Sequence, residues 1–170
     1  MEIKEEVMEH LEWTRRAVTE MVEHSESVHR GLNDSVNDDI MYLESSVLDL
    51  QDLAKENKDV STQSEVKWTA LSMAEGAYYR WHQFNKVLSK KQMIDKAVDT
   101  LMKKHHDYGN KPLIKFGLWG FVIRIDSKME RLKNLTQNNT GPELEGIEDT
   151  WFDIFGYAVL LLMYQYGHIK

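Results

Sequence analysis

Four carboxylates are paired at helical spacing, and these are the residues in the sequence best placed to do chemistry. Asp126 and Glu130 are four residues apart, and so are Asp149 and Asp153. On an α-helix this spacing places both side chains of a pair on one face. Facing acidic rows on neighbouring helices repel each other unless a cation lies between them, and Mg²⁺ prefers oxygen ligands. We therefore predict that these four residues bind Mg²⁺.

Two glutamates precede the second pair on the same predicted helix. We predict that Glu145 or Glu148 is a further ligand or the catalytic general base. Asp153 is the most informative acid because it lies inside an apolar run, residues 151–164. A buried carboxylate costs several kcal/mol, roughly, unless it has a partner, a proton or a metal. The alternative stays open that these acids complement the helix dipole or pair with nearby basic residues.

A basic row accompanies the first acidic pair. Arg124, Lys128 and Arg131 line one side of the apolar stripe in the predicted helix 113–135, and the acids line the other side. Arginine and lysine bind phosphate oxygens through charge-assisted hydrogen bonds. We predict that this row contacts phosphates, with help from Lys111 or Lys115. Attack of an activated water on a phosphate is the corresponding chemistry.

The segment 107–112 is predicted to be a loop. It contains Gly109 and a residue that precedes proline, and both favour turns. Loops held by helices commonly carry ligand contacts. We predict that Tyr108 and Asn110, with Trp119 in the following predicted helix, contact a ligand.

Helices must position these residues, because apolar side chains recur at helical spacing and no segment alternates like a strand. Tyr78 and Trp81 belong to an aromatic stripe, which we interpret as core packing rather than a base-stacking surface. The fold class is therefore predicted to be an all-α helical bundle. The predicted helices span residues 2–31, 36–56, 64–88, 90–106, 113–135 and 143–164.

The end of the predicted helix 90–106 is basic. Lys103 and Lys104 are placed on its outer face. Adjacent histidines on a helix point in different directions, so His105 and His106 are not expected to share a metal ion. We interpret this end as solvated, since cations suit a helix C-terminus.

Charge divides the chain of 170 residues into two parts. The formal net charge is -7, with an excess of acidic residues in residues 1–60 and a slight excess of basic residues in residues 61–170. Such asymmetry suggests two units. We predict an N-terminal acidic helical hairpin over 1–60, used as an accessory or for homo-oligomerisation, and a second helical domain over 61–170.

Composition excludes several classes of protein. There is no cysteine, hence no thiol nucleophile, disulfide framework or cysteine-based zinc site. No secretory signal or membrane span is recognised, so we expect a cytoplasmic protein without a membrane partner. Nucleic acid is not the expected partner, because no dense basic run occurs. Walker, GxSxG and HExxH motifs are also missing from the sequence.

Three segments together resemble the nucleotide modification associated domain family of phages and bacteria. They are HHDYGNK (105–111), VIRIDSKMERLKNL (122–135) and EGIEDTWFDIFGYAVL (145–160). The resemblance implies that residues 61–170 form a nucleotide-metabolism domain, of a kind often found in phage genomes. It makes Tyr108, Asn110 and Trp119 candidates for contact with a base or a sugar, and it adds Asp107 to the substrate-binding residues. Ser127 departs from the pattern, because it separates the acidic and basic residues that are adjacent there. The matching positions are Asp107, Tyr108, Gly109, Arg124, Asp126, Lys128, Arg131, Leu132, Glu145, Glu148, Asp149, Thr150, Asp153, Tyr157 and Ala158.

The architecture also resembles the MazG-like all-α nucleoside triphosphate pyrophosphatases, which hold Mg²⁺ on an E-x-x-E helix and an E-x-x-D helix. The chain departs from that spacing, because its acidic pairs are four residues apart. The leading expectation is a Mg²⁺-dependent (deoxy)nucleotide-processing enzyme, most simply a nucleoside triphosphate pyrophosphohydrolase. The alternative is a non-enzymatic helical interaction or adaptor protein, or a recombination-associated nucleic-acid-binding accessory protein.

Overall fold

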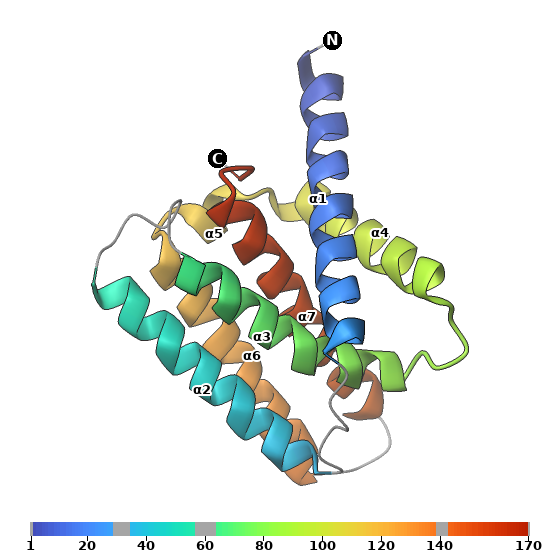
Figure 1. Cartoon of the computed structure of the whole chain (residues 1–170), viewed down its shortest axis with the longest axis vertical. Coiled ribbons are helices and arrows are strands. Elements are labelled where there is room, and N and C mark those ends of the chain that lie inside the picture. Colours follow the sequence, from blue (N-terminus) through green and yellow to red (C-terminus); the bar gives the residue numbers. More distant parts are fainter. Residues whose placement is uncertain (1, 29–34, 57–63, 139–142, 170) are drawn as a thin grey trace.

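The computed structural model describes residues 2–28, 35–56, 64–138 and 143–169. Over these ranges the chain forms helices and no strand, which confirms the all-α fold class (Figure 1). The side chains of residues 2, 3, 138 and 143–145 lie outside what is described. The helices are α1 (Glu2–Ser27), α2 (Val36–Lys55), α3 (Ser64–Gln83), α4 (Lys90–Tyr108), α5 (Lys111–Ile114), α6 (Leu118–Asn138) and α7 (Glu143–Gln165).

Helix α7 is the centre of the bundle and packs against α1, α3 and α6. Its apolar run explains this position, because a helix that is apolar on most sides must be buried on most sides. Trp151 is 1% exposed and Phe155 is fully buried. The aromatic stripe of α3 lies against this run, with the Trp81 and Phe155 ring centroids 5.9 Å apart. Tyr78 and Trp81 are therefore core residues, as the sequence predicts.

The two N-terminal helices lie on different sides of α3 (Figure 1). Helix α1 contacts α3, α4 and α7, whereas α2 contacts α3 and α6. A buried ion pair between Arg80 of α3 and Asp39 of α2 joins these two helices. The prediction of a hairpin within 1–60 thus differs from the structure, where α1 and α2 each join the common core through a wide apolar face. The end of the first predicted helix, residues 29–31, lies outside the described residues.

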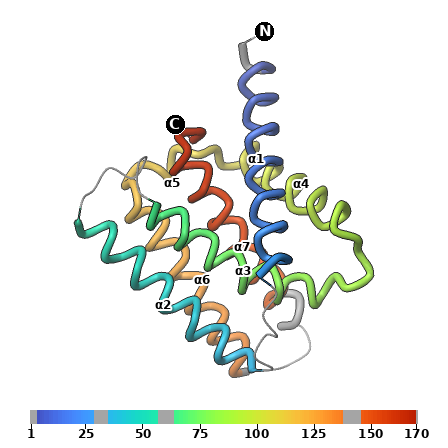
Figure 2. The backbone as a smooth tube through the Cα atoms, in the orientation of Figure 1, coloured from blue at the N-terminus to red at the C-terminus, as the bar shows by residue number. Residues whose placement is uncertain are grey.

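The connection from α4 to α6 is tighter than the predicted loop. Helix α4 continues to Tyr108, and Gly109 ends it with a φ of 66°, a left-handed conformation that glycine adopts without strain. The short helix α5 then turns the chain into α6 (Figure 2). A side chain at Gly120 would place its Cβ 2.1 Å from the Leu113 carbonyl oxygen, so α5 and the start of α6 touch through backbone.

None of the described helices has the length and apolar character needed to cross a membrane. The predicted cytoplasmic location and the predicted homo-oligomer stay predictions.

Candidate functional site

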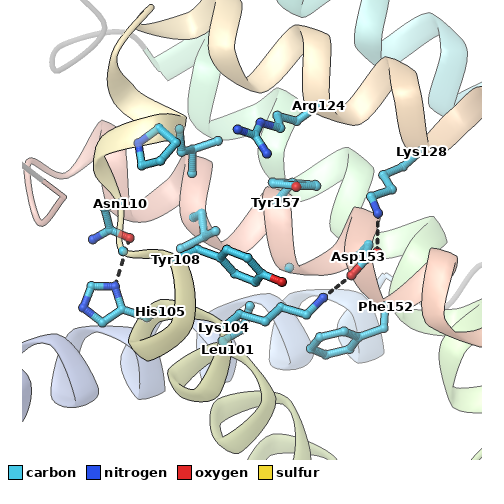
Figure 3. Close-up of a pocket in the computed structure, with 15 residues that line it drawn as sticks. Leu101, Lys104, His105, Tyr108, Asn110, Arg124, Lys128, Phe152, Asp153 and Tyr157 are labelled. Carbon is cyan, nitrogen blue, oxygen red and sulfur yellow. Dashed lines mark hydrogen bonds and ion pairs between the residues drawn. The ribbon is translucent and has the colours of Figure 1, made fainter.

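A pocket of about 350 Å³ opens between the C-terminal end of α4, α5, α6 and α7 (Figure 3). Its wall combines cationic, aromatic and aliphatic side chains from segments that are far apart in the sequence. The lining residues are Leu101, Lys104, His105, Tyr108, Gly109, Asn110, Pro112, Leu113, Arg124, Lys128, Phe152, Asp153, Gly156, Tyr157 and Leu160.

Two lysines bind one carboxylate at this pocket. Lys104 of α4 donates to Oδ1 of Asp153, and Nζ of Lys128 of α6 lies 2.7 Å from Oδ2. The Asp153 side chain is only 12% exposed. Burial alone raises the pKa of Asp153, but the two ammonium groups outweigh it and hold the pKa below its ordinary value. The two oxygens of Asp153 are therefore both occupied by cations.

Arg124 supplies a third cation one helical turn before Lys128. Its guanidinium points into the pocket above Tyr157 (Figure 3). No ion pair or side-chain hydrogen bond joins Arg124 to another residue in the described part of the chain. Among the described residues, the lining therefore carries three cations against one carboxylate, His105 aside. This excess of positive charge favours an anionic ligand.

Aromatic rings form another part of the wall. Tyr108, at the end of α4, is 77% exposed and faces the Tyr157 side of the pocket (Figure 3). Tyr157 is half-buried on α7, and Phe152 lies beside Lys104, whose ammonium is 5.4 Å from the ring centroid. Gly156 lets α4 and α7 approach, since an added Cβ would lie 3.0 Å from Leu101 Cδ2. A planar apolar group fits such a wall.

One of the lining residues, His105, belongs to a histidine pair. Nδ1 of His105 lies 3.2 Å from Oδ1 of Asn110, and the ring of His105 stacks on His10 of α1 with centroids 3.7 Å apart. Burial, with a smaller contribution from His105, lowers the pKa of His10 to about 4. His105 is therefore packed, unlike the solvated helix end that we predicted, whereas the His106 side chain is 90% exposed.

The predicted Mg²⁺ ligands are not brought together. Asp126, Glu130 and Asp149 are exposed, and Glu130 lies 3.2 Å from Lys133. Asp126 is two residues from both Arg124 and Lys128, a rotation of about 200° around α6, so it faces away from the pocket that they line. Among the described side chains, no three histidine, cysteine, aspartate or glutamate residues form a group that could hold a metal.

Asp153 alone does not fit a metal site as it stands, because lysines hold both of its oxygens. A Mg²⁺ ion requires several oxygen ligands in near-octahedral geometry. Binding of Mg²⁺ to these residues stays a prediction.

Glu148, one of the two predicted catalytic glutamates, lies in a polar network that joins three helical segments. Asn85, just after α3, donates to Glu148 Oε1 at 2.9 Å and to the Trp81 carbonyl at 3.0 Å. Lys96 of α4 donates to Asn85 at 2.6 Å. The role of this network is structural, because it holds the three segments together. The side chain of Glu145, the other predicted catalytic residue, lies outside the described residues.

Half of the predicted substrate-binding residues line the pocket. They are Tyr108, Asn110, Arg124 and Lys128. The other four, which do not line it, are Asp107, Lys111, Trp119 and Arg131. The sequence interpretation placed Lys104 on a solvated face and gave no role to Phe152. Lys104 precedes Tyr108 by four residues, and this i, i+4 spacing was the available signal.

Comparisons with known proteins found no family model, curated protein or solved structure that matches the chain. The resemblance to the nucleotide modification associated domain family therefore stays a prediction.

Proposed function

We propose that the chain binds a nucleotide in the pocket between α4, α5, α6 and α7. The phosphates contact Lys104, Lys128 and Arg124, and the base lies against Tyr108 and Tyr157. The observation that carries the proposal is Arg124, a guanidinium without a partner among the described residues that faces a pocket already containing two lysines. A guanidinium matches the geometry of phosphate oxygens, with which it forms two parallel hydrogen bonds.

The aromatic wall favours a nucleotide over an inorganic anion. A pocket of about 350 Å³ lies within the range of small-molecule sites. Stacking of a base on an aromatic side chain stabilises binding by roughly 1–3 kcal/mol. Tyr108 is the exposed ring available for such stacking, and Tyr157 lines the same pocket. A ligand with an aromatic base at one end and phosphates at the other complements both features.

Pyrophosphohydrolase activity is the finer part of this proposal. Three cations around the pocket would stabilise charge that develops on a phosphate, which is a major source of catalysis. Asp153 is the one carboxylate among the described lining residues and the candidate for a proton-accepting group once the lysines turn to phosphate.

Thermal shift and pyrophosphate release, measured on one nucleotide panel, test the proposal. Nucleoside triphosphates, monophosphates and uncharged nucleosides are compared, each with and without Mg²⁺. We expect triphosphates to raise Tm and nucleosides to leave it unchanged. A protein that is stabilised by no nucleotide in either condition contradicts the binding proposal. Stabilisation without release of pyrophosphate supports binding and contradicts the hydrolase.

A further inference from the structure

We propose that Asp153 is an internal competitor for the ligand, a tethered anion that occupies the phosphate subsite until a polyanionic ligand displaces it. This inference rests on the proposed function, because it concerns how the same pocket selects its ligand. Asp153 thereby determines which anions bind in the pocket.

The contacts of Asp153 define the subsite. Its Oδ1 accepts from Lys104 and its Oδ2 lies 2.7 Å from Lys128 Nζ, so one carboxylate bridges cations from two helices. Both lysines are also pocket-lining residues, with side chains 46% and 25% exposed. The ammonium groups that a ligand phosphate needs are therefore the ones that Asp153 holds. A carboxylate and a phosphate compete for the same donors.

The tether makes Asp153 a strong competitor. A group attached to the same fold is present at a high effective concentration, on the order of millimolar or above. When a ligand with one negative charge binds, it only replaces the Asp153 carboxylate at the lysines, so the gain in binding free energy is small. A di- or triphosphate offers several charged oxygens, which can contact both lysines and also Arg124. The pocket should therefore prefer polyphosphates to single carboxylates or phosphodiesters.

Arg124 gives the ligand an advantage that Asp153 lacks. The carboxylate bonds to the two lysines, and no bond joins it to Arg124 in the described part of the chain. A phosphate chain that spans all three cations makes contacts that Asp153 does not make. Displacement is driven by this extra contact and by the larger charge.

Isothermal titration of tripolyphosphate and of a nucleoside triphosphate, both without Mg²⁺, into wild type, Asp153→Asn and Asp149→Asn tests the inference. Asp149 is the matched control, because it lies one turn earlier on α7, is exposed and does not line the pocket. Both variants remove one negative charge. We expect Asp153→Asn to bind tripolyphosphate about tenfold more tightly than wild type, and Asp149→Asn to change the affinity by less than about twofold.

The outcomes separate the two proposals. If wild type binds and Asp153→Asn binds no more tightly, internal competition is wrong and the nucleotide pocket stands. If neither protein binds any polyphosphate or nucleotide, the proposed function itself fails. Equal gains in the two variants indicate a general charge effect and also contradict a local competitor.

A measurement on wild type covers the case in which Asp153→Asn does not fold. The side-chain carboxyl ¹³C resonance of Asp153 is followed while tripolyphosphate is added. We expect it to shift as the carboxylate loses its two ammonium partners, with a midpoint equal to the binding midpoint. A resonance that does not move while the phosphate binds overturns the inference.

Discussion

Nζ of Lys128 lies 2.7 Å from Oδ2 of Asp153, so a cation from α6 meets a carboxylate from α7 at the pocket. The same carboxylate binds Lys104 from α4, and the three helices are thereby joined at one point. The sequence interpretation assigned Asp153 to a metal and Lys128 to a phosphate. In the structure Lys128 of α6, rather than Asp126 or Glu130, contacts this acid of α7. Binding of Mg²⁺ by Asp153 stays a prediction.

Arg124 should contribute more to nucleotide affinity than any other arginine on α6. We expect Arg124→Gln to weaken triphosphate binding by about tenfold or more, since a bidentate contact to phosphate is lost. Arg131→Gln is the matched control, because Arg131 lies two turns further along the same helix and does not line the pocket. Isothermal titration measures both variants. Equal losses in the two would mean that only the general charge of α6 matters.

Removal of one lysine should make the protein more sensitive to acid. Asp153 has a lowered pKa in the folded state, so its ionised form stabilises the fold above its unfolded pKa, and this contribution is lost as the pH falls through the folded pKa. Lys104→Met removes one of the groups that lower that pKa. We expect the acid unfolding midpoint to move to higher pH, as followed by circular dichroism between about pH 2 and 7. An unchanged midpoint would show that Lys128 alone is sufficient.

His10 should make the stability of the fold depend on pH in a higher range than Asp153 does. Its pKa is lowered from 6.5 to about 4, so the folded state keeps His10 neutral where the unfolded state binds a proton. Stability should therefore fall as the pH drops from about 6.5 towards 4, by up to about 3 kcal/mol. His10→Gln should flatten this part of the Tm profile. His106→Gln, at an exposed histidine, should leave the slope as in wild type.

Gly120 should tolerate no side chain. An added Cβ would lie 2.1 Å from the Leu113 carbonyl oxygen, a backbone atom, so α5 must move. We expect Gly120→Ala to lower the free energy of unfolding by about 1–3 kcal/mol. Gly76→Ala is the control inside α3, because an added Cβ there would lie 3.8 Å from the nearest atom, Leu43 Cδ2. Since alanine favours a helix more than glycine does, this variant should raise the free energy of unfolding by up to about 1 kcal/mol. Urea unfolding of both variants measures the difference, and equal effects would contradict the close approach.

The fold was largely predictable because it depends on local periodicity. The apolar run of residues 151–164 indicated a buried helix, and α7 is the centre of the bundle. The arrangement of α1 and α2 was not predictable in this way. Both helices have apolar faces, but an apolar face does not determine which helix packs against it. In the structure α3 lies between these two consecutive helices.

Two cations of the site were predictable from the sequence, but the ion pairs at the site were not. Helical spacing placed Arg124 and Lys128 on one face, and both line the pocket. The same reasoning placed Asp126 and Glu130 on another face but could not say which face meets α7. The interhelical contact of Lys104 with Asp153 spans 49 residues, and the stack of His10 on His105 joins residues even further apart. Contacts of this range depend on tertiary packing, which spacing along one helix does not encode.

Backbone amide NMR shifts during titration with a nucleoside triphosphate show whether the nucleotide lies in this pocket. The measurement reports where the ligand lies, independently of any substitution or turnover. We expect the largest shifts at the pocket backbone, at Gly109, Asn110 and Gly156, with saturation at one stoichiometric equivalent. Shifts that cluster elsewhere on the bundle, or none at saturating nucleotide, would contradict a nucleotide site formed by Lys104, Arg124 and Lys128.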